Sequence, residues 1–302
     1  MWYILKIILI FSSGIVFANF ALEFGLFRYL NRAFRPLFSF ANISPEVAAS
    51  AMARVLSPSA GYSTLAEFHM AGRVDEREII VTTFLTTFIH ELLRIFRFYI
   101  PVAVPLLGIS LAIKYIAVKV GSGFIQSSLA LIYSKFRLPA VKDYNEEPER
   151  KPDMKLVIKQ SFKTLKRVIP LFVFTYGGVT LLLSLGLLSR IANFSEPIMT
   201  FFSLPGEASL VMVTQFANVV AGFATAGELV RQGILNGNKA LITLIIGLIF
   251  SLPRIYLQRT APLVASLFSR KIAFKITLVD NFFLVVYFHF SHALGKPSYN
   301  HH

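Results

Sequence analysis

The sequence predicts an all-α polytopic membrane protein made of two inverted repeats, each with a re-entrant helical hairpin and following transmembrane helices. Three observations lead to this fold class. The 302 residues are 55% hydrophobic and only 15% charged, whereas soluble domains are about a quarter charged. The mean hydropathy is +0.63. The stretch 44–72 also returns in altered form at 205–233.

The internal repeat pairs each position of 36–101 with one position of 197–262. Laid over each other without a gap, the two stretches share ten identities, against about four expected by chance. The matches include Gly61 with Gly222 and Glu67 with Glu228, which lie in otherwise apolar sequence. Glycine and glutamate need a structural or chemical reason to be tolerated there, so the two stretches are predicted to be copies of one unit.

The chain carries 30 basic and 16 acidic residues, a formal net charge of +14. Most basic residues lie between apolar runs, so cytoplasmic loops and anionic membrane lipid account for them, and nucleic acid is not predicted as a partner. The absence of cysteine excludes disulfides and thiolate metal sites. The sequence also lacks a phosphate-binding glycine loop, a nucleophile elbow and a zinc-binding helix motif. We therefore predict neither an enzyme nor a bound cofactor or metal.

The first half begins with an apolar stretch at 3–19, which fits either a signal peptide or a first span. A retained span is preferred, because the corresponding place in the second half, 168–188, is a charge-free run long enough to cross a bilayer. Arg28, Arg32 and Arg35 then recur at helical spacing beside Leu and Phe. They predict a helix lying at the membrane surface.

The hairpins are predicted from pieces that are too short to cross about 30 Å of hydrocarbon. In the first copy, helical pieces at 47–55 and 64–70 flank a break around Ser57. In the second copy, 208–227 has no charge and resembles one span, but the symmetry and Asn218 at the place of the first break favour the same broken hairpin. Broken backbone is tolerated at membrane depth only where protein or water surrounds it, so each hairpin is expected to line a site.

The remaining elements follow the hairpins in the same order in both halves. The predicted spans are 79–96 and 98–118 in the first half, and 168–188, 240–257 and 260–279 in the second, followed by an aromatic segment at 281–294. The segment 122–133 is too short to be predicted as a crossing. The predicted domains are a first repeat at 1–134 with its core at 36–118, a basic cytoplasmic linker at 135–167, and a second repeat at 168–302 with its core at 197–279.

Lysine and arginine predict the orientation in the membrane. The basic linker is placed in the cytoplasm, as is the loop after the first hairpin with Arg73 and Arg77, whereas the uncharged loop 234–238 after the second hairpin faces outward. The two copies therefore cross in opposite directions. The basic cluster 270–275 does not fit, since this scheme places it toward the outer leaflet.

Inverted hairpins bring short helix ends to a site near the bilayer midplane, where backbone dipoles and polar side chains can hold a solute. Each copy offers a hydroxyl or amide at the break, a glycine that lets backbone approach, and a glutamate six residues beyond that glycine. The predicted substrate-binding residues are Ser57, Ser59, Gly61, Thr64, Glu67, Gln215, Asn218, Gly222, Thr225 and Glu228. Arg54 is a further polar candidate near the first break. An intramembrane carboxylate is costly, so Glu67 and Glu228 are expected to meet a partner, a proton or a coupling cation.

Structural interpretations stay open for several of these residues. The two glycines can serve close helix crossing, and Thr64 and Thr225 can bond their own backbones. His90, Glu91 and Arg94, on one side of a helix, form either a buried network or a simple ion pair.

Two stretches resemble the two copies of the Gate, or nucleoside-recognition, domain: SPEVAASAMARVLSPSAGYSTLAEFHMAGRVDEREIIVTTFL and LPGEASLVMVTQFANVVAGFATAGELVRQG. This domain is shared by stand-alone archaeal membrane proteins, which the chain resembles most, by concentrative nucleoside transporters and by the membrane part of the ferrous-iron transporter. The resemblance covers about residues 36–118 and 197–279. It implies a transporter-like core whose hairpin tips meet at a substrate site, with Gln215, Asn218 and Glu228 as positions that would contact a nucleoside. The chain departs from the pattern in having no GTPase domain and fewer scaffold helices than full nucleoside transporters.

Together these features predict a multi-pass permease of the cell membrane that moves a small polar solute, nucleoside-like or ion-coupled, by alternating access. The alternative is a non-transporting membrane scaffold or partner subunit that acts through its basic cytoplasmic linker. A homo-oligomer is an open option in either case.

Overall fold

The computed structural model describes residues 34, 36–56, 58–139, 204–255 and 261–281, together with scattered positions between 154 and 173. The secondary structure of these residues is entirely helical, as the sequence predicted. The predicted span at 3–19, nearly all of the span at 168–188, most of the linker and nearly all of the aromatic segment 281–294 lie outside the described residues.

Both hairpins consist of two short helices packed against each other. The predicted break at Asn218 is confirmed, and the predicted break at Ser57 falls on a residue outside the described ones. The first hairpin is α3 (Pro45–Leu56) and α4 (Pro58–Met70), and the second is α10 (Ala208–Ala217) and α11 (Val219–Arg231). At the second break Asn218 has an extended backbone, with φ −160° and ψ 137°. Its side-chain oxygen accepts a hydrogen bond of 2.8 Å from the Val220 amide and so caps the new helix. The apolar stretch 208–227 is therefore interrupted, although it contains no charge.

The long helix that follows the first hairpin does not end where the sequence predicted. Its parts are α5 (Glu76–Arg94), the π-helix η2 (Ile95–Ala103) and α6 (Val104–Leu107), and they form one apolar helix of 32 residues. The predicted boundary between spans 79–96 and 98–118 is wrong. Pro101 lacks an N–H and would break an α-helix, but it lies inside η2, where the wider turn accommodates it.

The chain reverses at Gly108 instead, whose φ of 79° is easily adopted only by glycine. Helix α7 (Ile109–Arg137) then packs along α5. The segment 122–133 is consequently part of a helix of 29 residues rather than a separate short piece. Among the described residues, Glu76–Leu107 and Ile109–Arg137 are the two helices that are long and apolar enough to cross a membrane.

The second half repeats these boundaries at the positions that the sequence repeat pairs with them. Its remaining helices are α12 (Gly237–Ile255), α13 (Ala261–Leu267) and α14 (Arg270–Asn281). Helix α11 begins and ends at the positions equivalent to the two ends of α4, and α12 and α14 begin at the positions equivalent to the starts of α5 and α7. The predicted span 260–279 is wrong, because the helix ends at Leu267 and restarts at Arg270, the equivalent of the reversal at Gly108.

Two hydrophobic cores hold the described residues together, and each contains helices of both halves. The first core joins α3, α4 and α5 to α13 and α14, with Tyr62 edge-on to Phe268. The second core joins α10, α11 and α12 to η2, α6 and α7, with Phe223 against Tyr115 and Phe98. Each hairpin thus packs on the long helix of its own half and on the far end of the long helix of the other half.

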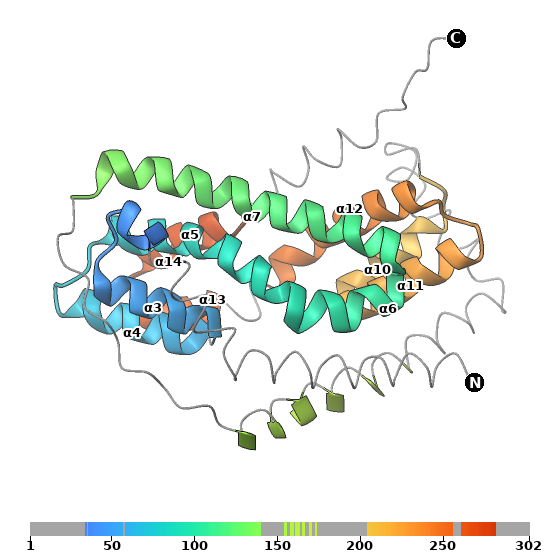
Figure 1. Cartoon of the computed structure of the whole chain (residues 1–302), viewed down its shortest axis with the longest axis horizontal. Helices are drawn as coiled ribbons and strands as arrows, with labels where there is room; N and C mark the ends of the chain where they lie inside the picture. The colour runs from blue at the N-terminus through green and yellow to red at the C-terminus, as the bar shows by residue number, and fades with distance from the viewer. Residues whose placement is uncertain are drawn as a thin grey trace, which may run out of the picture.

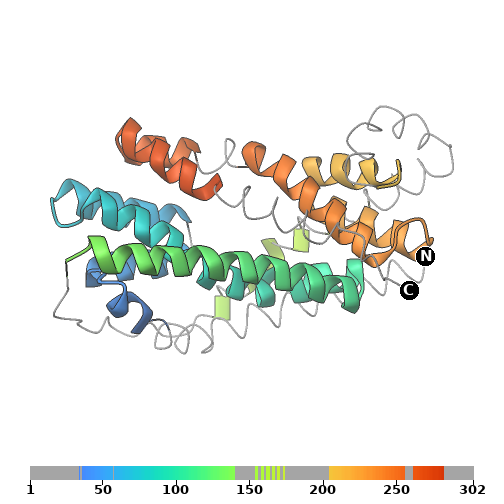
Figure 2. The same ribbon diagram turned by 90° about the horizontal axis from the view of Figure 1, so that it is seen from above.

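The two hairpins lie at opposite ends of the long axis (Figures 1 and 2). The connection from α4 to α5 is at one extreme and the connection from α11 to α12 is at the other, so α5 and α12 start from opposite ends. This arrangement agrees with the reciprocal packing of the two cores, in which each hairpin contacts helices of the other half.

Candidate functional site

The glycine of each hairpin is required by close backbone approach. A Cβ atom added to Gly61 would lie 2.2 Å from the Cβ of Arg54, and one added to Gly222 would lie 2.4 Å from the Cβ of Gln215. Real side chains do not approach so closely, so only glycine lets the two short helices meet here. The close-crossing interpretation of the two glycines therefore accounts for both positions.

The residue opposite each glycine ties its hairpin to the long helix. Arg54 Nη1 donates to the Thr86 hydroxyl at 2.8 Å and to the Thr83 carbonyl at 3.2 Å. Gln215 Nε2 donates to the Leu244 carbonyl at 3.0 Å. Arg54 and Gln215 occupy equivalent positions of the two repeats, and so do the residues that supply the two accepting carbonyls. The structure thus uses one anchor geometry twice.

The other predicted residues at the hairpins have mainly structural surroundings. Thr225 is buried and its hydroxyl donates to the Ala221 carbonyl at 3.0 Å, which is the backbone bond weighed as an alternative. Asn218 caps α11, and Thr64 is half-buried in α4. Ser57 lies outside the described residues, and Ser59 lies in the first turn of α4.

The predicted glutamate pair is not brought together. Glu67 is exposed near the end of α4, and Glu228 lies near the end of α11, so the two residues belong to hairpins at opposite ends of the molecule (Figure 1). The Glu228 carboxylate accepts hydrogen bonds from Arg231 and, at 2.9 Å, from Gln232. A glutamate six residues beyond the hairpin glycine is carried by the helix away from the break, which explains why these carboxylates share no hollow.

A buried ionic cluster, defined here as the Glu91 cluster, lies instead between α5, η2 and α7. Glu91 is 4% exposed and Lys119 5%. The Glu91 carboxylate contacts Lys119 Nζ at 3.3 Å, Arg94 Nη1 at 3.1 Å and the Tyr99 hydroxyl at 2.6 Å. The Glu91–Arg94 ion pair weighed from the sequence is present, and Lys119 and Tyr99 extend it into a buried network.

The Glu91 cluster is a candidate functional site because it places ionisable side chains inside an apolar helix pair. Ionisable groups are rare inside membrane-spanning helices and mark pathways or ligand sites when they occur. Glu91 lies near the midpoint of the helix Glu76–Leu107, and the π-helical turns that begin at Ile95 follow directly. Such turns are frequent at functional positions. Within the described ranges, no group of three or more histidine or acidic side chains could hold a metal ion.

Sequence reasoning missed Lys119 and Tyr99 as members of this cluster. Tyr99 lies eight residues beyond Glu91 in the same continuous helix, whereas Lys119 approaches Glu91 only because α7 folds back along α5 after Gly108. A signal was present, since Lys119 interrupts a long apolar stretch with a charge that needs a partner. The partner could not be read from spacing, because the end of one long helix, a chain reversal and the start of the next helix separate Lys119 from Glu91.

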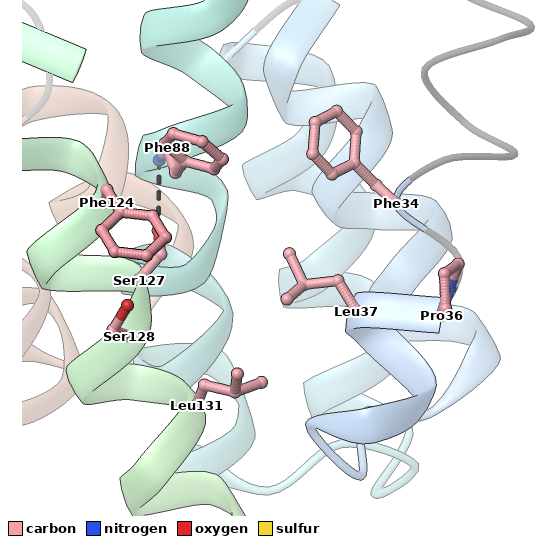
Figure 3. A pocket seen from close by; sticks show the side chains of 8 residues that line it. All are labelled: Phe34, Pro36, Leu37, Phe88, Phe124, Ser127, Ser128 and Leu131. Atoms are coloured by element: carbon pink, nitrogen blue, oxygen red, sulfur yellow. Dashed lines mark hydrogen bonds between the residues drawn. The ribbon is translucent and has the colours of Figure 1, made fainter. Parts of the chain in front are cut away.

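An open groove of about 310 Å³ lies beside this region but has a different character. Figure 3 shows Phe34 and Leu37 on one side of it and Phe88, Phe124 and Leu131 on the other. Its lining is mostly apolar, and the Ser127 hydroxyl is engaged, with the Phe88 amide donating to it at 3.2 Å. The groove therefore does not supply the polar contacts that a small hydrophilic solute requires.

Comparison with known proteins gives the family. Residues 165–271 match the family described as Gate, nucleoside recognition, which covers most of the second repeat. The chain is 34% identical over 277 residues to the uncharacterized protein MJ0880 of Methanocaldococcus jannaschii, covering 89% of each chain. It is 28% identical over 286 residues to the uncharacterized protein MJ0871 of the same organism, covering 92% of this chain and 89% of the relative. No solved structure matches it. Its broken hairpins, apolar helices and sequence relatives together show that the chain belongs to the nucleoside-recognition, or Gate, family of transporter-related membrane proteins.

Proposed function

We propose that the protein is a multi-pass permease of the cell membrane that moves a small polar solute, nucleoside-like or ion-coupled, by alternating access. The observation that carries this proposal is the reciprocal packing of two broken hairpins with matching anchors. Inverted repeats of this kind allow two nearly equivalent states, in which one unit moves against the other around a central site. In this proposal α3–α4 and α10–α11 are re-entrant and enter the membrane from opposite sides.

The contact between Glu76 and Lys275 supports this inverted topology. Lys275 donates to Glu76 at the start of α5, next to Arg73 and Arg77 in sequence. Its equivalent, Lys114, donates to Asn238 at the start of α12 at 2.7 Å. The proposed topology therefore puts the basic cluster 270–275 on the cytoplasmic side with the first loop, and no longer toward the outer leaflet. The sequence suggested the outer leaflet because 260–279 was treated as a separate crossing, whereas α12 and α13 are together the counterpart of α5–α6.

We place the solute site at the Glu91 cluster rather than at Glu67 and Glu228. A helix of 32 residues is about 48 Å long, so its midpoint lies near the centre of the bilayer. Arg54, at the tip of the first hairpin, is anchored to Thr86 about one turn from Glu91. Movement of that hairpin would change the surroundings of the cluster directly, which is what an alternating-access site needs.

The test is uptake of labelled nucleosides and other small polar solutes into proteoliposomes. We expect the native protein to transport, Glu91→Gln to lose flux, and Tyr99→Phe, which removes one hydroxyl and should fold normally, to lower it several-fold. Lys114→Met, at the exposed contact, serves as the matched control and should transport normally. Thermal unfolding in detergent separates misfolding from loss of transport.

Three outcomes would count against this proposal. Loss of flux in Glu228→Gln with normal flux in Tyr99→Phe would move the site back to the hairpin carboxylates. Absence of uptake of any solute by the native protein would reject the permease. Loss of function on deletion of 140–153, with solute binding intact, would favour the scaffold alternative.

A further inference from the structure

Gln126 on α7 is fully buried, and neither atom of its side-chain amide has a hydrogen-bond partner among the residues that the structure describes. Its exposed fraction is 0%. Buried polar side chains are almost always hydrogen-bonded, and hydrocarbon cannot supply the missing partner. A leucine would fill the same space without this loss of free energy. The amide therefore points to a polar partner that is not part of the described helices.

The position of Gln126 connects it to the Glu91 cluster. It lies two helical turns beyond Lys119, so both side chains leave the same face of α7. Gly123 lies between them, and a Cβ there would lie 3.3 Å from the Cα of Phe88 and 3.4 Å from Cγ of Glu91. This close approach brings the α7 face directly onto the segment of α5 that carries Glu91.

The neighbouring polar side chains of this face are engaged elsewhere. Ser127 donates to the Leu85 carbonyl at 2.9 Å and accepts from the Phe88 amide, as Figure 3 shows for the latter. Ser122 donates to the Lys119 carbonyl at 2.8 Å. Among the described residues of this face, Gln126 is thus the one whose side-chain donor and acceptor both lack a hydrogen-bond partner.

We propose that Gln126 is a specificity-determining residue of the solute pathway. It binds an uncharged solute that presents a donor and an acceptor side by side, as a carboxamide does. A carboxamide side chain can donate through Nε2 and accept through Oε1 at once, which selects for this paired edge and against a purely anionic or purely cationic group. This inference rests on the proposed permease function and names the chemistry of its substrate.

The experiment compares Gln126→Leu, Gln126→Glu and the native protein with a matched control, Ser44→Ala. The hydroxyl of Ser44 is also buried without a partner among the described residues, but Ser44 directly precedes the first residue of α3 and is not part of the Glu91 cluster. The probes are nicotinamide and uridine as neutral donor–acceptor solutes, and uridine monophosphate as an anionic counterpart. Uptake gives KM and the maximal rate, and solute-induced shifts in thermal unfolding give binding without transport.

We expect Gln126→Leu to raise KM for the neutral probes at least tenfold with a smaller change in maximal rate, and to unfold at the same or a higher temperature. Gln126→Glu, which lacks the donor, should also bind them weakly, whereas Ser44→Ala should resemble the native protein. An unchanged KM in Gln126→Leu would overturn the inference, and a buried water would then be the partner of the Gln126 amide. A native protein that binds neutral probes but transports nothing, with binding lost in Gln126→Leu, would reject the permease and retain the role of Gln126. Absence of any probe-induced shift in the native protein would overturn the inference itself.

Discussion

The two repeats share a backbone but differ in the chemistry that it carries. In both repeats, the hairpin glycine, Gly61 or Gly222, packs against a polar residue of the preceding helix. The side chain of that polar residue donates a hydrogen bond to a backbone carbonyl of the long helix that follows the hairpin. In the first repeat the anchor is the charged Arg54, and in the second it is the neutral Gln215. The Glu91 cluster has no counterpart in sequence, because the positions equivalent to His90, Glu91 and Arg94 are serine, leucine and isoleucine at 251, 252 and 255.

This difference teaches which features a duplicated membrane fold must keep. The close approach at the hairpin and the breaks in the helices determine the geometry, so both copies retain them. Buried charge is costly in the membrane and is retained only where it has a role, so one copy can lose it. We therefore expect the residues that determine solute specificity to lie in the first repeat, and the second repeat to contribute mainly to packing.

The largest expected effect is at Glu91. Glu91→Gln removes the carboxylate from a buried contact with Lys119, and we expect it to lower the free energy of unfolding by about 3–5 kcal/mol. Ser251→Ala, at the second-repeat position equivalent to His90, removes one hydrogen bond to Gly247 and should cost about 1 kcal/mol. Unfolding by denaturant in detergent measures both. Equal losses of unfolding free energy in the two variants would contradict the proposed difference between the repeats. A Glu91→Gln, Lys119→Gln double variant should recover part of the unfolding free energy lost in Glu91→Gln, because it no longer leaves Lys119 buried without its partner.

The next effect tests the shared geometry. Gly61→Ala and Gly222→Ala force a Cβ into a neighbouring side chain, so each should cost about 1–3 kcal/mol of unfolding free energy. Gly121→Ala is the control, because no described atom lies within 4 Å of a Cβ at that position, and it should be neutral or stabilise α7 by up to about 1 kcal/mol. A large cost at only one hairpin glycine would break the equivalence of the two hairpins.

The anchors should respond more weakly. Arg54→Gln copies the second anchor into the first repeat, where the amide can reach the Thr83 carbonyl but not the Thr86 hydroxyl. We expect a loss of about 1 kcal/mol in unfolding free energy. Gln215→Leu removes one bond and also a buried oxygen that lacks a partner among the described residues, so its cost should be smaller. Unfolding by denaturant in detergent measures both, and a stronger effect at Gln215 would reverse the proposed division of roles.

The smallest effects are expected where the halves touch at their outer ends. Lys275→Met removes a partly exposed ion pair with Glu76 and should cost about 0–1 kcal/mol, less at high salt than at low salt. Lys114→Met removes a contact with neutral Asn238 and should show no such salt dependence. Thermal unfolding at two ionic strengths checks both variants, and identical salt responses would contradict the difference between the ends.

Several elements were predictable because their causes are local. The break at Asn218 follows from a side chain that caps its own helix, and the hairpin glycines mark the close crossing. The end of the first long helix was misplaced because Pro101 normally stops an α-helix, and only the surrounding packing allows the π-helical turns that absorb it. The predicted site included Glu67 and Glu228 because the repeat pairs them in sequence, although the fold places their helices at opposite ends.

From the amino-acid sequence alone we could predict that the chain is helical and apolar, that it contains two related halves, and where the second hairpin breaks. These properties depend on composition, on the pairing of the two halves and on residues within a turn or two of each other. Only the folded structure shows that Lys119 meets Glu91 and that Gln126 has no partner among the described helices. Such pairings depend on which helices pack and at what depth, and side chains far apart in sequence acquire neighbours only when the long helices fold back on each other.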